Sequence, residues 1–93
     1  MSAAYRFSVS IMPRDGILDP QGRAVEAALP ELGAVNVHHV RVGRRVDLEV
    51  EAGTEAEAWT TVDRLAKELF ANPLIESWQI ESQPVTARMG PPK

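Results

Sequence analysis

The fold is decided by residues 46–51, Val-Asp-Leu-Glu-Val-Glu, in which apolar and acidic side chains alternate strictly. A period of two places the apolar side chains on one face of a β-strand and the acidic side chains on the other. Residues 5–11, Tyr-Arg-Phe-Ser-Val-Ser-Ile, repeat the pattern. The two segments therefore predict strands of an antiparallel sheet with one buried face and one polar face.

Helices are predicted before and after residues 46–51. The first begins at Asp19-Pro20, because the carboxylate can accept hydrogen bonds from the first turn and proline suits the first helical position. The second begins with Thr54 and Glu57, which have the spacing of a capping box, and it ends before Pro73.

Two further strands complete the pattern. Residues 35–42 predict one of them, with a bulge around His38 and His39, and a two-residue hairpin turn at Gly43-Arg44 would join it to residues 46–51. The last strand is predicted at residues 77–81. The order β-α-β-β-α-β indicates an α+β, ferredoxin-like fold, a four-stranded antiparallel sheet in the order 4-1-3-2 with both helices on one face. We expect residues 1–82 to form this single domain and residues 83–93 to be a flexible C-terminal tail.

Composition limits the function classes. The chain has 93 residues, of which 44% are hydrophobic, enough for one domain of modest stability that pairing with another chain would help. It contains no cysteine, which fits a cytoplasmic location. A net charge of −3 argues against binding to nucleic acid, and no apolar run approaches the ~20 residues of a membrane span. We expect no contact with nucleic acid or membranes.

Candidate catalytic groups have simpler structural explanations. His38 and His39 are adjacent, so on a strand they point to opposite faces and cannot bind one metal together. Asp47, Glu49 and Glu51 share a strand face, as acids for proton transfer or metal binding could, but a solvated sheet face predicts the same pattern more often. The sequence lacks a nucleophile motif and a phosphate-binding glycine loop. We expect no catalytic, cofactor or metal site in this chain.

Two loops are more elaborate than the fold requires, and they supply the candidate partner contacts. Leu18 could be a hydrophobic staple on the first helix, and Arg44 and Arg45 could lie at a solvated hairpin tip. Alternatively, the loops contact another protein, with the arginine pair binding a carboxylate of that partner through two hydrogen bonds. The candidate residues are Gly16, Leu18, Asp19, Pro20, Gln21, Arg41, Gly43, Arg44 and Arg45.

These loops carry a resemblance to a known family. Residues 16–22 (Gly-Ile-Leu-Asp-Pro-Gln-Gly), 40–44 (Val-Arg-Val-Gly-Arg) and 72–76 (Asn-Pro-Leu-Ile-Glu) resemble PurS, the small subunit of phosphoribosylformylglycinamidine synthase in organisms that split this enzyme into separate chains. The resemblance extends from about Tyr5 to Glu81, and Leu-Asp-Pro-Gln-Gly is its most specific part. Pro30, late in the first helix, and the tail at residues 83–93 depart from the usual pattern.

The resemblance implies a non-catalytic subunit of a purine-biosynthesis ligase, forming a homodimer or higher oligomer. Such a subunit bridges a PurL-like synthetase, which uses ATP and Mg²⁺, and a PurQ-like glutaminase, which releases ammonia from glutamine. ATP and Mg²⁺ would then belong to the synthetase, and this chain would hold no cofactor.

Two other proteins with this element order are alternatives. An ACT-like regulatory domain binds small molecules near a glycine of the first strand–helix loop, where Gly16 lies. An acylphosphatase-like enzyme needs an arginine in a phosphate-holding loop and a suitably placed asparagine. Arg14 could be the arginine of the phosphate-holding loop, and Asn36 and Asn72 are the only asparagines in the sequence. Fold likeness alone does not separate these possibilities.

Overall fold

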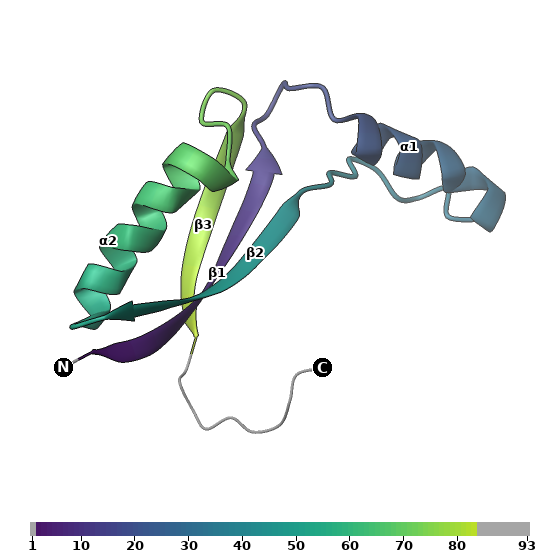
Figure 1. The fold of residues 1–93 in the computed structure, drawn as a ribbon. Helices are drawn as coiled ribbons and strands as arrows, with labels where there is room; N and C mark the ends of the chain where they lie inside the picture. Colours follow the sequence, from purple (N-terminus) through teal and green to yellow (C-terminus); the bar gives the residue numbers. More distant parts are fainter. Residues whose placement is uncertain (1, 84–93) are drawn as a thin grey trace.

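The computed structural model describes residues 2–83 as a three-stranded antiparallel sheet with two α-helices (Figure 1). The central strand is β1, and the order across the sheet is β2-β1-β3. The elements are β1 (Ala3–Pro13), α1 (Pro20–Ala28), the 3₁₀ turn η1 (Pro30–Leu32), β2 (Arg44–Ala52), α2 (Glu55–Leu65), the π-helical turn η2 (Ala66–Phe70) and β3 (Glu76–Gln83).

The core lies between the sheet and α2. Phe7, Val9 and Ile11 of β1 are almost completely buried, as the alternation in residues 5–11 predicts. The helix contributes mainly small residues at its buried positions, which allows it to lie close to the sheet. Trp59 packs edge-on against Phe7, with ring centroids 5.4 Å apart. The core is therefore small and centred on one strand.

The opposite face of the sheet is polar and uncovered, as predicted. Ser8 is its one buried polar residue among those described, and its hydroxyl donates to Asp47 at 2.8 Å. The same hydroxyl accepts hydrogen bonds from Arg45 and Gln83. Because Ser8 is fully satisfied by neighbouring strands, this cluster stabilises the sheet.

The prediction of a fourth strand at residues 35–42 was wrong for the single chain. Arg44 is already the first residue of β2, opposite Ile11 of β1, so Gly43-Arg44 is not a hairpin turn. A methyl group added to Gly43 would overlap the carbonyl oxygen of Ile11 and the sulfur of Met12, so the backbone runs close beside the end of β1 at this point. His39 has a φ of 61°, which interrupts the extended backbone where the sequence indicated a bulge.

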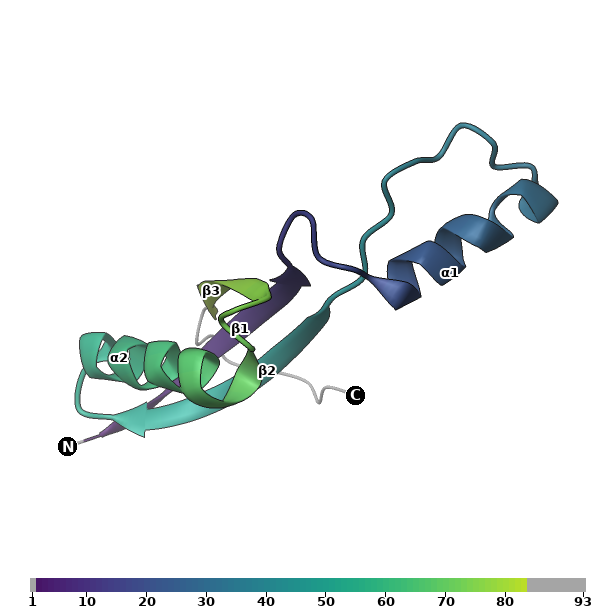
Figure 2. The same ribbon diagram turned by 90° about the horizontal axis from the view of Figure 1, so that it is seen from above.

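The prediction that both helices cover one face of the sheet was also wrong. Only α2 does so, whereas α1 projects beyond the end of the sheet (Figures 1 and 2). We call residues 20–43 the arm: α1, η1 and the segment that leads back to β2. The radius of gyration is 17.1 Å, against about 12 Å for a compact chain of this length. In α1 only Gly22 is buried, so the arm does not share the core.

The ends of α1 and β3 show how the chain leaves these elements. α1 ends at Ala28, two residues before Pro30, and Pro30 begins η1. Gln83, expected to begin the tail, is the last residue of β3, and residues 84–93 lie outside the described part of the chain. Within the described residues, no helix has the length and apolar character needed to span a membrane.

The close passage at Gly43 gives a first prediction. In Gly43→Ala the new methyl group would overlap the carbonyl of Ile11, so we expect unfolding to become easier by about 1–3 kcal/mol in urea denaturation. Gly53→Ala is the control, because its methyl group would meet only the mobile end of Glu57, at 3.1 Å. Equal stability of the two variants would contradict the tight passage.

Candidate interaction surface at the root of the arm

A cleft lies where the arm leaves the sheet, and most of the predicted contact residues line it. We call it the root cleft. Six of the nine candidates are in its lining, and Gly16, Arg41 and Arg45 are not. The lining also includes Ile75, just before β3, and Glu76, the first residue of β3, and neither was among the candidates. The lining residues are Pro13, Ile17, Leu18, Asp19, Pro20, Gln21, Val42, Gly43, Arg44, Ile75 and Glu76.

Asp19 connects the two chain segments of the arm. As the predicted N-cap of α1, its Oδ1 accepts a hydrogen bond from the Gly22 N–H at 3.0 Å. Its Oδ2 accepts a second from the Val42 N–H at 2.9 Å, which no local pattern indicated. The hydrogen bond from Val42 contributes most to lowering the pKa of Asp19 below its ordinary value, and the one from Gly22 contributes next.

Glu26 makes a similar contact about two helical turns after Asp19. Its Oε2 accepts a hydrogen bond from the Val40 N–H at 3.0 Å. Two carboxylates of α1 thus hold alternate N–H groups of the same extended segment. No sequence pattern predicts this role for Glu26, because a glutamate on a half-exposed helix face is ordinary.

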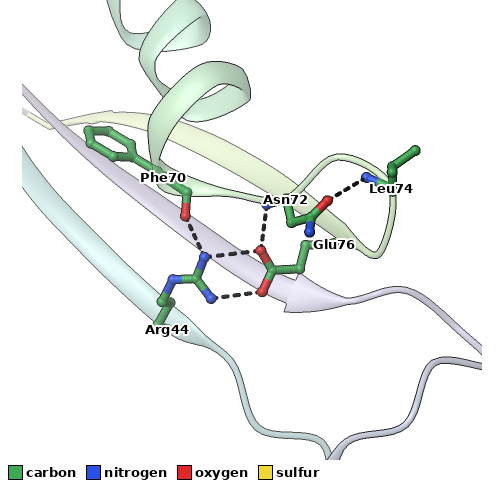
Figure 3. A network of polar contacts seen from close by, with 5 residues as sticks. All are labelled: Arg44, Phe70, Asn72, Leu74 and Glu76. Carbon is green, nitrogen blue, oxygen red and sulfur yellow. Dashed lines mark hydrogen bonds and ion pairs between the residues drawn. The ribbon is translucent and has the colours of Figure 1, made fainter.

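Arg44 is the centre of a polar network that we call the Arg44 clasp (Figure 3). Its guanidinium binds Glu76 through two hydrogen bonds of 2.7 and 3.0 Å and also donates to the carbonyl oxygen of Phe70. Glu76 Oε1 accepts from the Asn72 N–H at 2.7 Å, and the Asn72 side chain accepts from the Leu74 N–H. The clasp therefore ties the starts of β2 and β3 to the end of η2.

The clasp changes the interpretation of Arg44. Its guanidinium already binds a carboxylate through two hydrogen bonds, but that carboxylate belongs to its own chain. The Glu76 interaction raises the pKa of Arg44, and the Arg44 hydrogen bond is the main cause that lowers the pKa of Glu76. Arg44 thus positions the cleft wall, and a protein partner would meet the surfaces around it.

The three remaining candidates, Arg45, Arg41 and Gly16, lie outside the cleft. Arg45 is on the polar sheet face, where its Nε donates to Asp47 at 2.8 Å. Arg41 forms a long, exposed ion pair of 3.7 Å with Asp15. Gly16 has a φ of 85°, so it serves the turn after β1.

The rim of the root cleft exposes apolar side chains. Leu18 is 71% exposed, which does not fit the staple interpretation, since a staple leucine packs against its helix. Ile75, which lines the cleft from the loop before β3, is 40% exposed, and its chain neighbour Leu74 is 85% exposed. Apolar side chains around a cleft of a small chain are typical of a protein-binding surface.

Two features bear on the alternative chemistries that the sequence left open. The described residues contain no group of three or more side chains able to hold a metal ion. Arg14, the arginine an acylphosphatase-like loop would use, donates from Nε to the carbonyl oxygen of Pro73 at 3.1 Å.

The three sequence motifs that carry the family resemblance meet here. Residues 16–22 and 40–44 are joined by Asp19, and residues 40–44 and 72–76 by Arg44 and Glu76. In a comparison with protein families, residues 6–84 match PurS, described as phosphoribosylformylglycinamidine (FGAM) synthase. The chain belongs to the PurS family. The resemblance inferred from the sequence is thereby confirmed.

Individual relatives agree with this membership. The chain is 40% identical over 80 residues to the phosphoribosylformylglycinamidine synthase subunit PurS of Mycobacterium leprae, covering 84% of this chain and 98% of the relative. It is 37% identical over 81 residues to that of Synechocystis, covering 87% and 81%. Among solved structures, the PurS subunit of Thermotoga maritima has a TM-score of 0.81 at 28% identity, covering 89% of this chain and 95% of that one. The structure of PurLQS from the same organism matches with a TM-score of 0.79 at 28% identity, covering 87% and 99%.

The clasp and Arg45 give a prediction about stability. Arg44→Ala removes three hydrogen bonds and leaves Glu76 without its cation, so we expect a loss of about 1–2 kcal/mol in urea denaturation. Arg45→Ala removes an exposed ion pair with Asp47 and one hydrogen bond to Ser8, whose hydroxyl keeps its bonds to Asp47 and Gln83, so it should destabilise the chain less than Arg44→Ala does. If Arg45→Ala were the more destabilising change, the structural role assigned to Arg44 would be wrong.

The lowered pKa values predict acid sensitivity. Asp19 and Glu76 bind fewer protons in the folded than in the unfolded chain, so their stabilisation is present above their unfolded pKa values and is lost as pH falls through the folded ones. The urea midpoint should therefore fall from about pH 5 downwards. In Glu76→Gln this fall should be smaller, because the carboxyl group whose lowered pKa contributes to it is gone. A parent-like pH profile in Glu76→Gln would contradict the assignment.

Proposed function

We propose that the chain is the non-catalytic bridging subunit of phosphoribosylformylglycinamidine synthase in purine biosynthesis. In this role it couples a PurQ-like glutaminase subunit to a PurL-like, ATP-dependent synthetase subunit for ammonia transfer. The observation that carries the proposal is the root cleft, which assembles the three family motifs around the Arg44 clasp. ATP and Mg²⁺ would bind to the synthetase, and the proposed location is the cytoplasm.

The shape of the surface fits a protein partner. Leu18 and Ile75 offer exposed apolar contacts in a cleft whose polar wall is held in place by internal hydrogen bonds. A wall fixed before binding lowers the conformational cost of association. The match to a PurLQS structure supports PurL-like and PurQ-like chains as the partners, and self-association into a homodimer or higher oligomer is part of the proposal.

Assembly is the contribution that such a chain can make to catalysis. Ammonia released by one subunit has to reach a second subunit before it is lost to solvent, so the two sites must be joined by a closed path. A bridging subunit stabilises the arrangement in which that path is closed. It needs complementary surfaces for this task and no reactive group of its own.

Reconstitution tests the proposal. Mixed with its cognate PurL-like and PurQ-like subunits, glutamine and Mg²⁺-ADP, the chain should give a joint peak in size-exclusion chromatography with light scattering. The joint peak should disappear without the chain, and glutamine-dependent activity should fall while activity with added ammonia is retained. Assembly and glutamine-dependent turnover that do not need the chain would refute the bridging role.

Matched variants locate the contact. Leu18→Glu and Leu69→Glu alter leucines that are each 71% exposed, one at the root cleft and one in η2. We expect Leu18→Glu to weaken assembly by about tenfold or more, because it places a charge in the contact surface, and Leu69→Glu to change it little. Equal affinities of the two variants for the partner subunits would remove the root cleft from the proposed interface.

A further inference from the structure

We propose that Arg14 and Arg41 bind a carboxylate side chain of a partner subunit. The two arginines line an open hollow beside the root cleft, which we call the arginine hollow. Its lining residues are Pro13, Arg14, Asp15, Arg41 and Ser77. The inference rests on the proposed function and deepens it, since it names a charged contact and the chemical group that the contact receives.

The arginine hollow adjoins the root cleft. Pro13 lines both, and Ile75 and Glu76 of the cleft directly precede Ser77 of the hollow. Arg14 comes from the turn after β1 and Arg41 from the arm, so the hollow lies where these two segments meet the start of β3. A protein seated in the root cleft therefore reaches the arginine hollow within the same interface.

The arginines outside the hollow are mostly engaged by the chain's own acidic side chains. Ion pairs of 2.7 to 3.4 Å hold Arg6, Arg44, Arg45 and Arg64. Within residues 2–83, neither Arg14 nor Arg41 has an ion pair shorter than 3.7 Å. Because a guanidinium that already binds a carboxylate closely has fewer donors to offer, the two arginines of the hollow are better suited to a partner's carboxylate than Arg44 or Arg45.

Arg14 is held in position from inside the chain. Its backbone N–H donates to the carbonyl oxygen of Ile75 at 2.8 Å, and its Nε donates to the carbonyl oxygen of Pro73 at 3.1 Å. Its two terminal nitrogens donate no hydrogen bond to the described part of the chain. A guanidinium fixed at Nε presents its terminal N–H groups as a pair, which suits two parallel hydrogen bonds to a carboxylate. Fixing the group beforehand lowers the conformational cost of binding.

Arg41 has only a weak internal partner. Its Nη1 lies 3.7 Å from Asp15 Oδ1, which is longer than a hydrogen bond, and the Asp15 side chain is fully exposed. An exposed ion pair of this kind contributes little to stability, so an incoming carboxylate can replace Asp15. Two guanidinium groups and one carboxylate leave the hollow with one net positive charge, which matches a single carboxylate.

The exposure of the hollow favours a protein carboxylate over a small free anion. Arg14, Asp15, Arg41 and Ser77 are all exposed, so a free anion bound to them would keep part of its hydration and be held weakly. A carboxylate carried by a protein that also fills the root cleft is delivered without a separate binding event, and the protein excludes water from the ion pair.

Titration of the chain into its cognate PurL-like and PurQ-like subunits, with glutamine and Mg²⁺-ADP present, tests the contact. We expect Arg14→Ala/Arg41→Ala to raise the dissociation constant of the assembled complex by about tenfold or more. The matched control is Arg64→Ala/Lys67→Ala, which removes the same two charges from α2 and η2 and should stay close to the parent. A parent-like dissociation constant in Arg14→Ala/Arg41→Ala would overturn the proposal.

Two further readouts separate a charged contact from a change in the fold. Added salt should weaken assembly of the parent chain more than that of Arg14→Ala/Arg41→Ala, because salt screens exposed charges. Asp15→Asn should tighten assembly by about two- to fivefold, because it removes the carboxylate that competes for Arg41. An equal salt dependence of the parent and the double variant, or weaker assembly of Asp15→Asn, would contradict the binding of an anion in the hollow.

Inorganic phosphate tests a free anion as the occupant. The purified chain should show no saturable binding of phosphate in isothermal titration calorimetry. Saturable binding that disappears in Arg14→Ala/Arg41→Ala would assign the hollow to a small anion and overturn the partner contact. Failure of the parent chain to assemble with the other subunits would refute the bridging role, whereas equal assembly of the parent and the double variant would refute only the arginine contact.

Discussion

The pairing of Arg44 with Glu76 is the interaction on which the rest of the structure depends. It joins the first residue of β2 to the first residue of β3, on either side of the end of β1. The same guanidinium binds the carbonyl of Phe70, so the end of the covering helix is fixed at the same point. With these three elements held together, the direction in which the chain enters β2 is set, and with it the direction of the arm.

The consequence is a chain built for association. Its core consists largely of one strand face and one helix, which is little buried surface for a domain of this size. Much of its remaining apolar surface lies on the arm and around the root cleft. A family of bridging subunits has a use for such an arrangement, because stability gained through contact couples folding of the subunit to assembly.

The sequence predicted the elements better than their arrangement. Alternation located β1, β2 and β3, and capping residues located the starts of both helices, because these signals are local. The placement of residues 35–42 failed because it depends on a steric contact between Gly43 and Ile11, which no periodicity encodes. In the candidate site, Asp19 and Arg44 were found from their loops, but Glu26 and Glu76 were not. Glu76 belongs to the motif at residues 72–76, but nothing in that motif indicates that it pairs with a residue 32 positions away.

The most direct test of this account is a double-mutant cycle on Arg44 and Glu76, measured by urea denaturation of the chain without its partner subunits. The account predicts that Arg44→Ala and Glu76→Gln together destabilise the chain by less than the sum of their separate effects, with a coupling energy of about 0.5–3 kcal/mol, because each change alone already removes the pair. Additive effects of the two changes would contradict the central place of this interaction.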